Sequence, residues 1–420
     1  MAEQWLKQMA QDAAELETPM VVVHREKLVQ NVEEMAEFAR RHGVRLRPHL
    51  KTHKTWEIAE MQLAAGAVGL TCAKLGEAHV FLERGAKDVL VAYPLVGPKI
   101  SRLFQLMAQF PEAVVQTLTG ELAHARALSE AATAHGERLK LWIKVDSGLK
   151  RVGVEPGEAA AQLYRDVIRL PGVEVQGFLT HAGHAYGAES HERVRAIGEY
   201  EAQCLLDTAQ MVKKQQLLAE REVVCEGENS ARAGGESADC TGAASVGWNV
   251  EERGPFSGSS LAISVGSTPT VRISGAVAGV TEIRPGNYVF NDATQIRLGA
   301  ATEETCSLRV LSRVVSRPAP DRIVIDAGAK TLALDRGAHG SDALQGYGLV
   351  VGYEHAVIER LSEEHGVVRI PSDSRIQVGD VLEIIPNHSC PVANLTDNLH
   401  VLNQDGSLSV WRVIARGQTI

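Results

Sequence analysis

Short apolar runs alternate with amphipathic stretches through the first 290 residues of the chain. One such stretch, residues 25–41, places Leu28, Val32, Met35 and Ala39 on a single helical face. Alternating strands and helices predict β–α crossovers and a parallel sheet, and eight strands favour a closed (β/α)8 TIM barrel over an open doubly wound sheet. The runs that are typical of buried strands lie at 44–51, 68–73, 88–93, 113–118, 139–146, 173–181, 261–267 and 283–290.

The pattern changes after about residue 292, where strand-like runs are separated by Gly, Pro, Asn and Asp. The first of them is QIRLGAA (295–301), and DVLEIIPNH (380–388) is typical of the rest. We therefore expect two domains, a barrel over 20–291 and a mostly β domain over 292–420 that also includes residues 1–19.

Residues 226–260 fit neither domain, because their Gly-, Ser- and Ala-rich sequence has no helical or strand period. A structureless loop of this length inside a barrel is uncommon unless it is a surface insertion. We expect a mobile insertion here, either without a function or acting as a lid or an oligomer contact.

Composition narrows the possible partners. The 420 residues carry a formal net charge of −9, so nothing suggests binding to nucleic acid. No apolar run is long enough for a membrane span, and the N-terminal segment lacks the apolar core of a secretory signal. We expect a cytoplasmic protein with no membrane association.

Polar residues gather where the predicted strands end, which in a barrel is the edge that carries the active site. Lys51, in RPHLKTHK, ends the first strand. The cluster around it is also compatible with a solvated corner, but a lysine at the inner end of a barrel strand is partly desolvated. Desolvation lowers its pKa and allows its amine to form a Schiff base with a carbonyl.

The segment GSTPT (266–270) follows the seventh strand, where barrels commonly bind phosphate. Gly266 permits close backbone approach, and Ser267 and Thr268 supply hydroxyl donors. Such turns are common, so the segment alone is weak evidence. Together with Lys51 it suggests an aldehyde that carries a phosphate, pyridoxal 5′-phosphate.

Eight motifs in order carry a family resemblance: RPHLKTHK, DSGLKRVGV, GFLTHAGHAYG, SVGSTPT, EIRPGNYVFND, IDAGAKTLALD, LSEEHG and GDVLEIIPNHSCPVANL. They resemble the metal-activated fold-type III pyridoxal enzymes of the D-threonine aldolase and D-serine dehydratase family, whose first domain is like that of alanine racemase. The resemblance spans nearly the whole chain except 226–260. It implies that Lys51 binds the cofactor covalently.

The resemblance also implies roles for other residues. Arg151 would lie near the pyridine ring, and Tyr186 and Tyr288 would line the cofactor, although either tyrosine is also compatible with domain packing. Gly266, Ser267 and Thr268 would hold the phosphate.

In the second domain, His388 and Cys390 are two residues apart, so in an extended segment they project to the same side. A His-x-Cys pair is weak evidence by itself, but it coincides with the family's metal site. We expect a divalent metal, Zn²⁺ or Mn²⁺, since imidazole and thiolate suit zinc and softer divalent ions.

The resemblance implies a lyase that acts on D-3-hydroxy amino acids, with two possible outcomes. If Lys51 takes the Cα proton and the metal helps the β-hydroxyl to leave, D-serine gives pyruvate and ammonia. If the hydroxyl is deprotonated, with His181 or His184 as the base, D-threonine gives glycine and acetaldehyde.

Cys390 as second metal ligand resembles the D-serine and D-3-hydroxyaspartate dehydratases and favours the dehydratase type, because we expect an aspartate there in the aldolases. A racemase, or a pyridoxal phosphate-binding protein without catalysis, remains a further alternative. Related enzymes commonly dimerise, so we also expect a homodimer.

Overall fold

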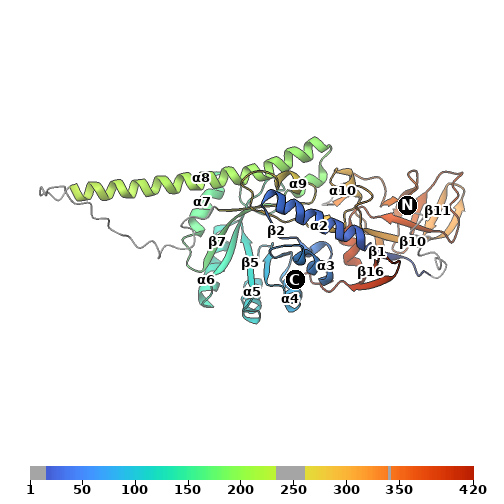
Figure 1. Cartoon of the computed structure of the whole chain (residues 1–420), viewed down its shortest axis with the longest axis horizontal. Coiled ribbons are helices and arrows are strands. Elements are labelled where there is room, and N and C mark those ends of the chain that lie inside the picture. Colours follow the sequence, from blue (N-terminus) through green and yellow to red (C-terminus); the bar gives the residue numbers. More distant parts are fainter. Residues whose placement is uncertain (1–15, 233–260, 339–341) are drawn as a thin grey trace.

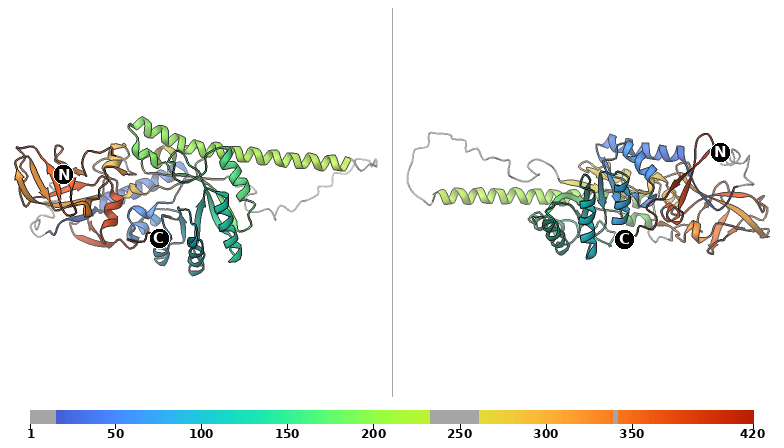
Figure 2. Two further views of the ribbon diagram at one scale, coloured as in Figure 1. Left: turned by 180° about the vertical axis from the view of Figure 1, so that it is seen from behind. Right: turned by 90° about the horizontal axis from the view of Figure 1, so that it is seen from below.

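The computed structural model describes residues 16–232, 261–338 and 342–420, with only the backbone considered for 217–232. The molecule is elongated, with a barrel beside a separate β domain (Figure 1). A helical arm extends from the barrel on the side away from the β domain (Figure 2).

The barrel is an eight-stranded parallel sheet in the order β2-β9-β8-β7-β6-β5-β4-β3. The sheet curls so that its two edges come together, where His49, which follows β2, forms a parallel bridge with Thr71 of β3. The predicted (β/α)8 fold is confirmed, and each predicted run overlaps one strand. The strands are β2 (Arg45–Leu46), β3 (Leu70–Cys72), β4 (Asp88–Val91), β5 (Val114–Thr119), β6 (Leu139–Lys144), β7 (Val173–Leu179), β8 (Ala262–Val265) and β9 (Glu282–Ile283).

Helices cover the outside of this sheet. The first of them, α2 (Arg25–His42), buries Leu28, Val32, Met35 and Ala39, as their spacing predicts. It ends at Gly43, whose left-handed φ of 64° suits glycine. The other barrel helices are α3 (Trp56–Ala64), α4 (Leu75–Glu83), α5 (Pro98–Gln109), α6 (Leu122–Ala134), α7 (Glu158–Val167), α8 (His191–Arg232) and α9 (Val271–Ser274).

Three segments of the barrel differ from the sequence prediction. Most of 283–290 is not a strand, because a 3-10 turn, η4 (Asn287–Val289), follows the short β9. Lys51 likewise lies in a 3-10 turn, η1 (Leu50–Thr52). Helix α8 continues to Arg232, so the first residues of the predicted insertion are helical, and its remainder lies outside the described residues.

The β domain contains a nine-stranded sheet in the order β11-β14-β13-β12-β15-β10-β1-β16-β17. Strand β1 (Met20–His24) belongs to this sheet, between β10 and β16, although the sequence assigned only residues 1–19 to the domain. The other strands are β10 (Leu308–Ala319), β11 (Arg322–Ile325), β12 (Leu349–Val350), β13 (Val357–Leu361), β14 (Gly366–Arg369), β15 (Val381–Ile385), β16 (Asn398–Leu402) and β17 (Leu408–Arg412).

Short helices interrupt this domain. They are α10 (Ala293–Arg297), α11 (Ala329–Leu332) and α12 (Ser389–Leu395). The predicted strand at 295–301 is wrong, because Asp292 accepts a hydrogen bond from the Gln295 backbone N–H and starts α10.

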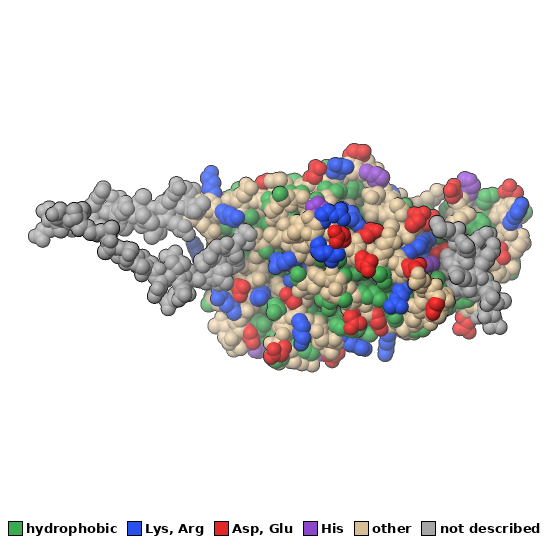
Figure 3. Space-filling model, in the orientation of Figure 1, with side chains coloured by type: hydrophobic (Ala, Val, Ile, Leu, Met, Phe, Trp, Pro, Cys, Tyr) green, Lys and Arg blue, Asp and Glu red, His purple; other side chains and the backbone are tan. Residues whose placement is uncertain are grey.

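On the face shown in Figure 3, acidic and basic side chains are interspersed. Exposed ion pairs of the described residues include Glu37 with Arg40 and Glu34 with Arg272. None of the helices in the described ranges has the length and apolar character that crossing a membrane requires.

Candidate active site

A cavity of about 460 Å³ lies at the barrel mouth, where α12 of the β domain approaches it. A larger surface hollow of about 760 Å³ lies between α2 and α3 and contains none of the predicted site residues. The predicted residues that line the cavity are Lys51, His181, Tyr186, Ser267, Thr268, His388 and Cys390. The structure therefore brings together seven side chains from both domains.

Lys51 is held on both sides of its turn. The His49 Nδ1 atom accepts a hydrogen bond from the Lys51 backbone N–H at 3.4 Å, and the Asn394 side chain donates to the Lys51 carbonyl at 3.2 Å. Burial lowers the pKa of Lys51, and the charge of Arg151 adds to this effect, while Cys390 opposes it. A lowered pKa increases the fraction of neutral amine, which can act as a nucleophile or a base.

The loop after β8 fits a phosphate group. At Gly266 the backbone passes so close to Arg284 that an added Cβ would lie 2.8 Å from the Arg284 nitrogen. The Ser267 hydroxyl lies 2.9 Å from that of Thr270. The Thr268 hydroxyl is buried at the cavity wall, where the Tyr186 hydroxyl is its neighbour. Hydroxyls buried at a cavity wall suit a phosphate oxygen as a further partner.

Tyr186 and His181 line the cavity beside this loop. Burial raises the pKa of Tyr186, so its hydroxyl stays protonated near neutral pH. The His181 Nδ1 atom lies 2.5 Å from the Gly266 carbonyl oxygen. Because a carbonyl oxygen only accepts, Nδ1 carries the hydrogen, and Nε2 of the neutral ring carries the lone pair.

His388 and Cys390 lie at the start of α12 rather than in the predicted extended segment. The His388 Nδ1–H donates to Asp335 at 2.6 Å, and the His388 side chain is also hydrogen-bonded to Cys390. Burial alone would lower the pKa of His388, but Cys390 and Asp335 raise it to about 10. Burial would likewise raise the pKa of Cys390, but His388 and the Thr52 hydroxyl, 3.2 Å away, lower it overall.

This imidazole and thiolate suit a soft divalent cation, and the carboxylate on His388 is the usual support of a metal-binding histidine. The described residues contain no group of three or more His, Cys, Asp or Glu side chains that could hold a metal ion. Among the described residues, His388 and Cys390 are thus the two side chains that would hold such a metal.

Four of the predicted residues do not line the cavity: Gly266, His184, Arg151 and Tyr288. Arg151 is exposed in the loop after β6 and lines a neighbouring hollow, although its charge still affects Lys51 and His49. Tyr288 is buried, and its hydroxyl accepts a hydrogen bond from Gln62 at 2.9 Å. The structure places Tyr288 in the packing between α3 and η4.

Several residues that sequence reasoning missed support the site. Asp292 accepts hydrogen bonds from the Asn287 side chain at 2.7 Å and from the Ser389 backbone at 3.0 Å, and so fixes α12 to the barrel. Asn287, Asp292 and Asp335 lie inside motifs that carry the family resemblance, so the motifs could have indicated them. Glu201 on α8 lies in none of them.

The comparisons with known proteins agree with this geometry. The family described as alanine racemase, N-terminal domain, matches residues 23–239, just over half of the chain, and a serine dehydratase domain matches 307–402. The chain belongs to the fold-type III pyridoxal phosphate enzymes.

The relatives of this fold-type III enzyme are dehydratases and aldolases. It is 29% identical to D-threo-3-hydroxyaspartate dehydratase of Delftia sp., covering 94% of this chain and 97% of the relative. It is also 29% identical to a D-threonine aldolase of Arthrobacter, with 96% and 94% covered. The solved structure of the Delftia dehydratase superposes with a TM-score of 0.78 at 28% identity, covering 95% of this chain and 98% of that one.

Proposed function

We propose that this enzyme is a lyase for D-3-hydroxy amino acids that catalyses dehydration, with D-serine giving pyruvate and ammonia. The observation that carries the proposal is the pairing of His388 with Cys390 at the cavity that contains Lys51. The fold-type III family and the named dehydratase relatives support it.

We propose that His388 and Cys390 hold the divalent metal, Zn²⁺ or Mn²⁺. Imidazole and thiolate are donors that suit zinc and softer divalent ions. Solved variants of D-threo-3-hydroxyaspartate dehydratase support this assignment, because they replace a histidine and a cysteine two positions apart, and the cysteine variant was solved in a metal-free form.

Bound pyridoxal phosphate supplies an electron sink at Cα, and a bound metal supplies Lewis acidity. The chain supplies the rest. Ser267 and Thr268 hold the phosphate by their hydroxyls, and the fixed turn around Lys51 orients its amine. Because its pKa is lowered, Lys51 takes the Cα proton. Overall, the Cα–H and Cβ–O bonds break, and water then releases ammonia from the dehydrated product.

The alternative function is aldol cleavage of D-threonine. His181 favours it, because its Nε2 lone pair provides a base that could accept the β-hydroxyl proton. Loss of that proton leads to breakage of the Cα–Cβ bond instead of the Cβ–O bond.

Product analysis of the purified holoenzyme tests both functions. D-Serine and D-threonine are each supplied with EDTA and with added zinc or manganese. We expect metal-dependent pyruvate or 2-oxobutyrate together with ammonia, and none from a Lys51→Ala variant. Glycine and acetaldehyde from D-threonine would identify an aldolase, and no product from either amino acid would refute the proposal.

We propose that the enzyme is a cytoplasmic homodimer, and light scattering of the purified protein tests the dimer.

A further inference from the structure

Hydrogen bonds from the barrel converge on Cys390, although Cys390 belongs to the β domain. The Thr52 hydroxyl lies 3.2 Å from the Cys390 Sγ atom, and the Asn287 side-chain amide donates to the same atom at 3.5 Å. Thr52 is on η1 and Asn287 is on η4, so both partners come from turns that follow neighbouring barrel strands. The sulfur atom is thus oriented by the domain that carries Lys51.

The direction of the bond between Thr52 and Cys390 follows from the chemistry of the sulfur. A cysteine binds a metal ion as its thiolate, which has no hydrogen to donate. With a metal bound, the Thr52 hydroxyl must therefore be the donor, and a hydrogen bond to an anionic acceptor is stronger than a neutral one. Thr52 is fully buried, so bulk water does not replace this donor when it is removed.

A second contact fixes the backbones of the same two segments. The Asn394 side-chain amide donates to the Lys51 carbonyl at 3.2 Å and to the Cys390 carbonyl at 2.8 Å. It therefore joins Cys390 to the residue that precedes Thr52. Because η1 and α12 are linked through both a side chain and the backbone, the thiolate has a fixed place relative to the turn that carries Lys51.

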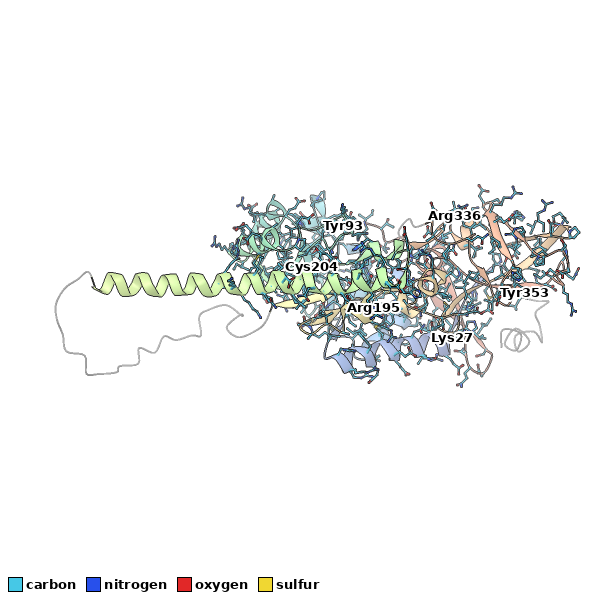
Figure 4. The ribbon with its side chains drawn as sticks, turned by 90° about the horizontal axis from the view of Figure 1, so that it is seen from above. Lys27, Tyr93, Arg195, Cys204, Arg336 and Tyr353 are labelled. Carbon is cyan, nitrogen blue, oxygen red and sulfur yellow. The ribbon has the colours of Figure 1, made fainter. Side chains whose placement is uncertain are left out.

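His388 is supported from the other domain. Its partner Asp335 belongs to the β domain. Figure 4 shows the next residue, Arg336, on that domain and Tyr93 on the barrel. The two side chains that would hold the metal thus have separate supports, a carboxylate of the β domain for the imidazole and a hydroxyl of the barrel for the thiolate.

We propose that Thr52 is a positioning residue for the metal, because its hydroxyl holds the Cys390 thiolate in the direction that metal binding requires. This inference rests on the metal assignment in the proposed function. Loss of a group that hydrogen-bonds to a metal ligand typically weakens metal binding by about 10- to 100-fold. The role of Thr52 is therefore measured as metal affinity, which does not depend on turnover.

Zinc binding to the holoenzyme, measured by competition with a chelator, tests the proposal. Thr52→Val keeps the shape of the side chain, and we expect it to raise the zinc dissociation constant by about 10-fold or more. Thr52→Ser restores the hydroxyl and should bind zinc within about 3-fold of the wild type. An unchanged constant in Thr52→Val, or an equal weakening in Thr52→Ser, would overturn the proposal.

Thr55→Val is the matched control. The Thr55 hydroxyl is also fully buried and donates to the His53 carbonyl at 2.7 Å, but Thr55 does not line the cavity. The same substitution therefore removes a buried hydrogen bond of the same segment away from the sulfur. We expect zinc affinity to change by less than about 3-fold. A loss equal to that of Thr52→Val would overturn the proposal, because it would show a general loosening of this segment.

His388→Ala distinguishes a failure of this proposal from a failure of the metal assignment. If zinc binding weakens in His388→Ala but not in Thr52→Val, the assigned ligand is right and the role of Thr52 is refuted. If zinc binding is unchanged in His388→Ala, the metal assignment fails and the proposal fails with it. Zinc affinity is measured without substrate, so it still decides the role of Thr52 if the enzyme dehydrates no hydroxy amino acid.

Discussion

Glu201 is the residue whose replacement most directly tests how the fold builds the site. It lies on α8, is fully buried, and accepts hydrogen bonds from the Ala182 backbone N–H at 3.0 Å and the Gly266 backbone N–H at 3.1 Å. The Thr270 hydroxyl donates to it at 2.7 Å. One carboxylate thus fixes the loops after β7 and β8, which carry His181 and the hydroxyls that we propose to hold the phosphate.

Glu201→Gln keeps the shape of this side chain but removes its charge. A hydrogen bond to a charged group is worth about 1.5–3 kcal/mol and a neutral one about 0.5–1.5 kcal/mol, so each of the three bonds loses about 1 kcal/mol. Glu201 also raises the pKa of Lys144 and of Arg284, and without it two buried cations lose a counter-charge. We expect the free energy of unfolding to fall by about 3 kcal/mol.

Urea denaturation, followed by tryptophan fluorescence and far-UV circular dichroism, measures this change. Glu199→Gln is the control, because it removes an equal charge from an exposed position of the same helix and should cost less than about 0.5 kcal/mol. If Glu201→Gln costs no more than this control, the carboxylate does not hold the two loops and the reasoning is refuted.

Three further perturbations test the site. Gly266→Ala places a Cβ against the Arg284 backbone; we expect a loss of about 1–3 kcal/mol in stability together with weaker pyridoxal phosphate binding, measured by equilibrium dialysis. Burial is the larger cause, and the charge of Arg284 the second, of a lowered pKa of about 7 for Lys144. Because this folded-state pKa lies below the unfolded one, the contribution of Lys144 to stability is present above its unfolded pKa and is lost as pH falls toward 7. In urea denaturation, the free energy of unfolding of the wild type, relative to that of Lys144→Met, should rise by at most about 4 kcal/mol between pH 7 and pH 10. Parallel pH profiles for the two proteins would contradict this. Asp335→Asn should weaken zinc binding by His388 by about 10- to 100-fold in a chelator competition, and an unchanged affinity would show that the carboxylate does not support the histidine.

The barrel could be predicted because its signals are local. Each buried strand is a short apolar run, and α2 shows its buried face in the spacing of Leu28, Val32, Met35 and Ala39. Strand β1 could not be placed this way, because its run is equally compatible with either domain. Its pairing with β10 and β16 depends on contacts with residues far along the chain.

The motifs predicted the residue types at the site better than their positions. Lys51, His388 and Cys390 meet at one cavity, as the resemblance implies. The sequence does not show that Tyr288 points toward Gln62, since that direction is set by the 3-10 turn after β9. Glu201 gave no signal, because a carboxylate on a long charged helix is indistinguishable from a solvated one until the fold buries it.

The choice between dehydration and aldol cleavage depends on where the β-hydroxyl of the substrate lies. His181 presents a lone pair on Nε2, because the Gly266 carbonyl fixes its hydrogen on Nδ1. In the proposed function His388 would instead hold the metal together with Cys390, and Asp335 orients its ring through Nδ1. A hydroxyl next to His181 would lose its proton and favour cleavage, whereas one directed at His388 and Cys390 would lie next to that metal, which would help it to leave. The depth of the substrate between these side chains would therefore select the product.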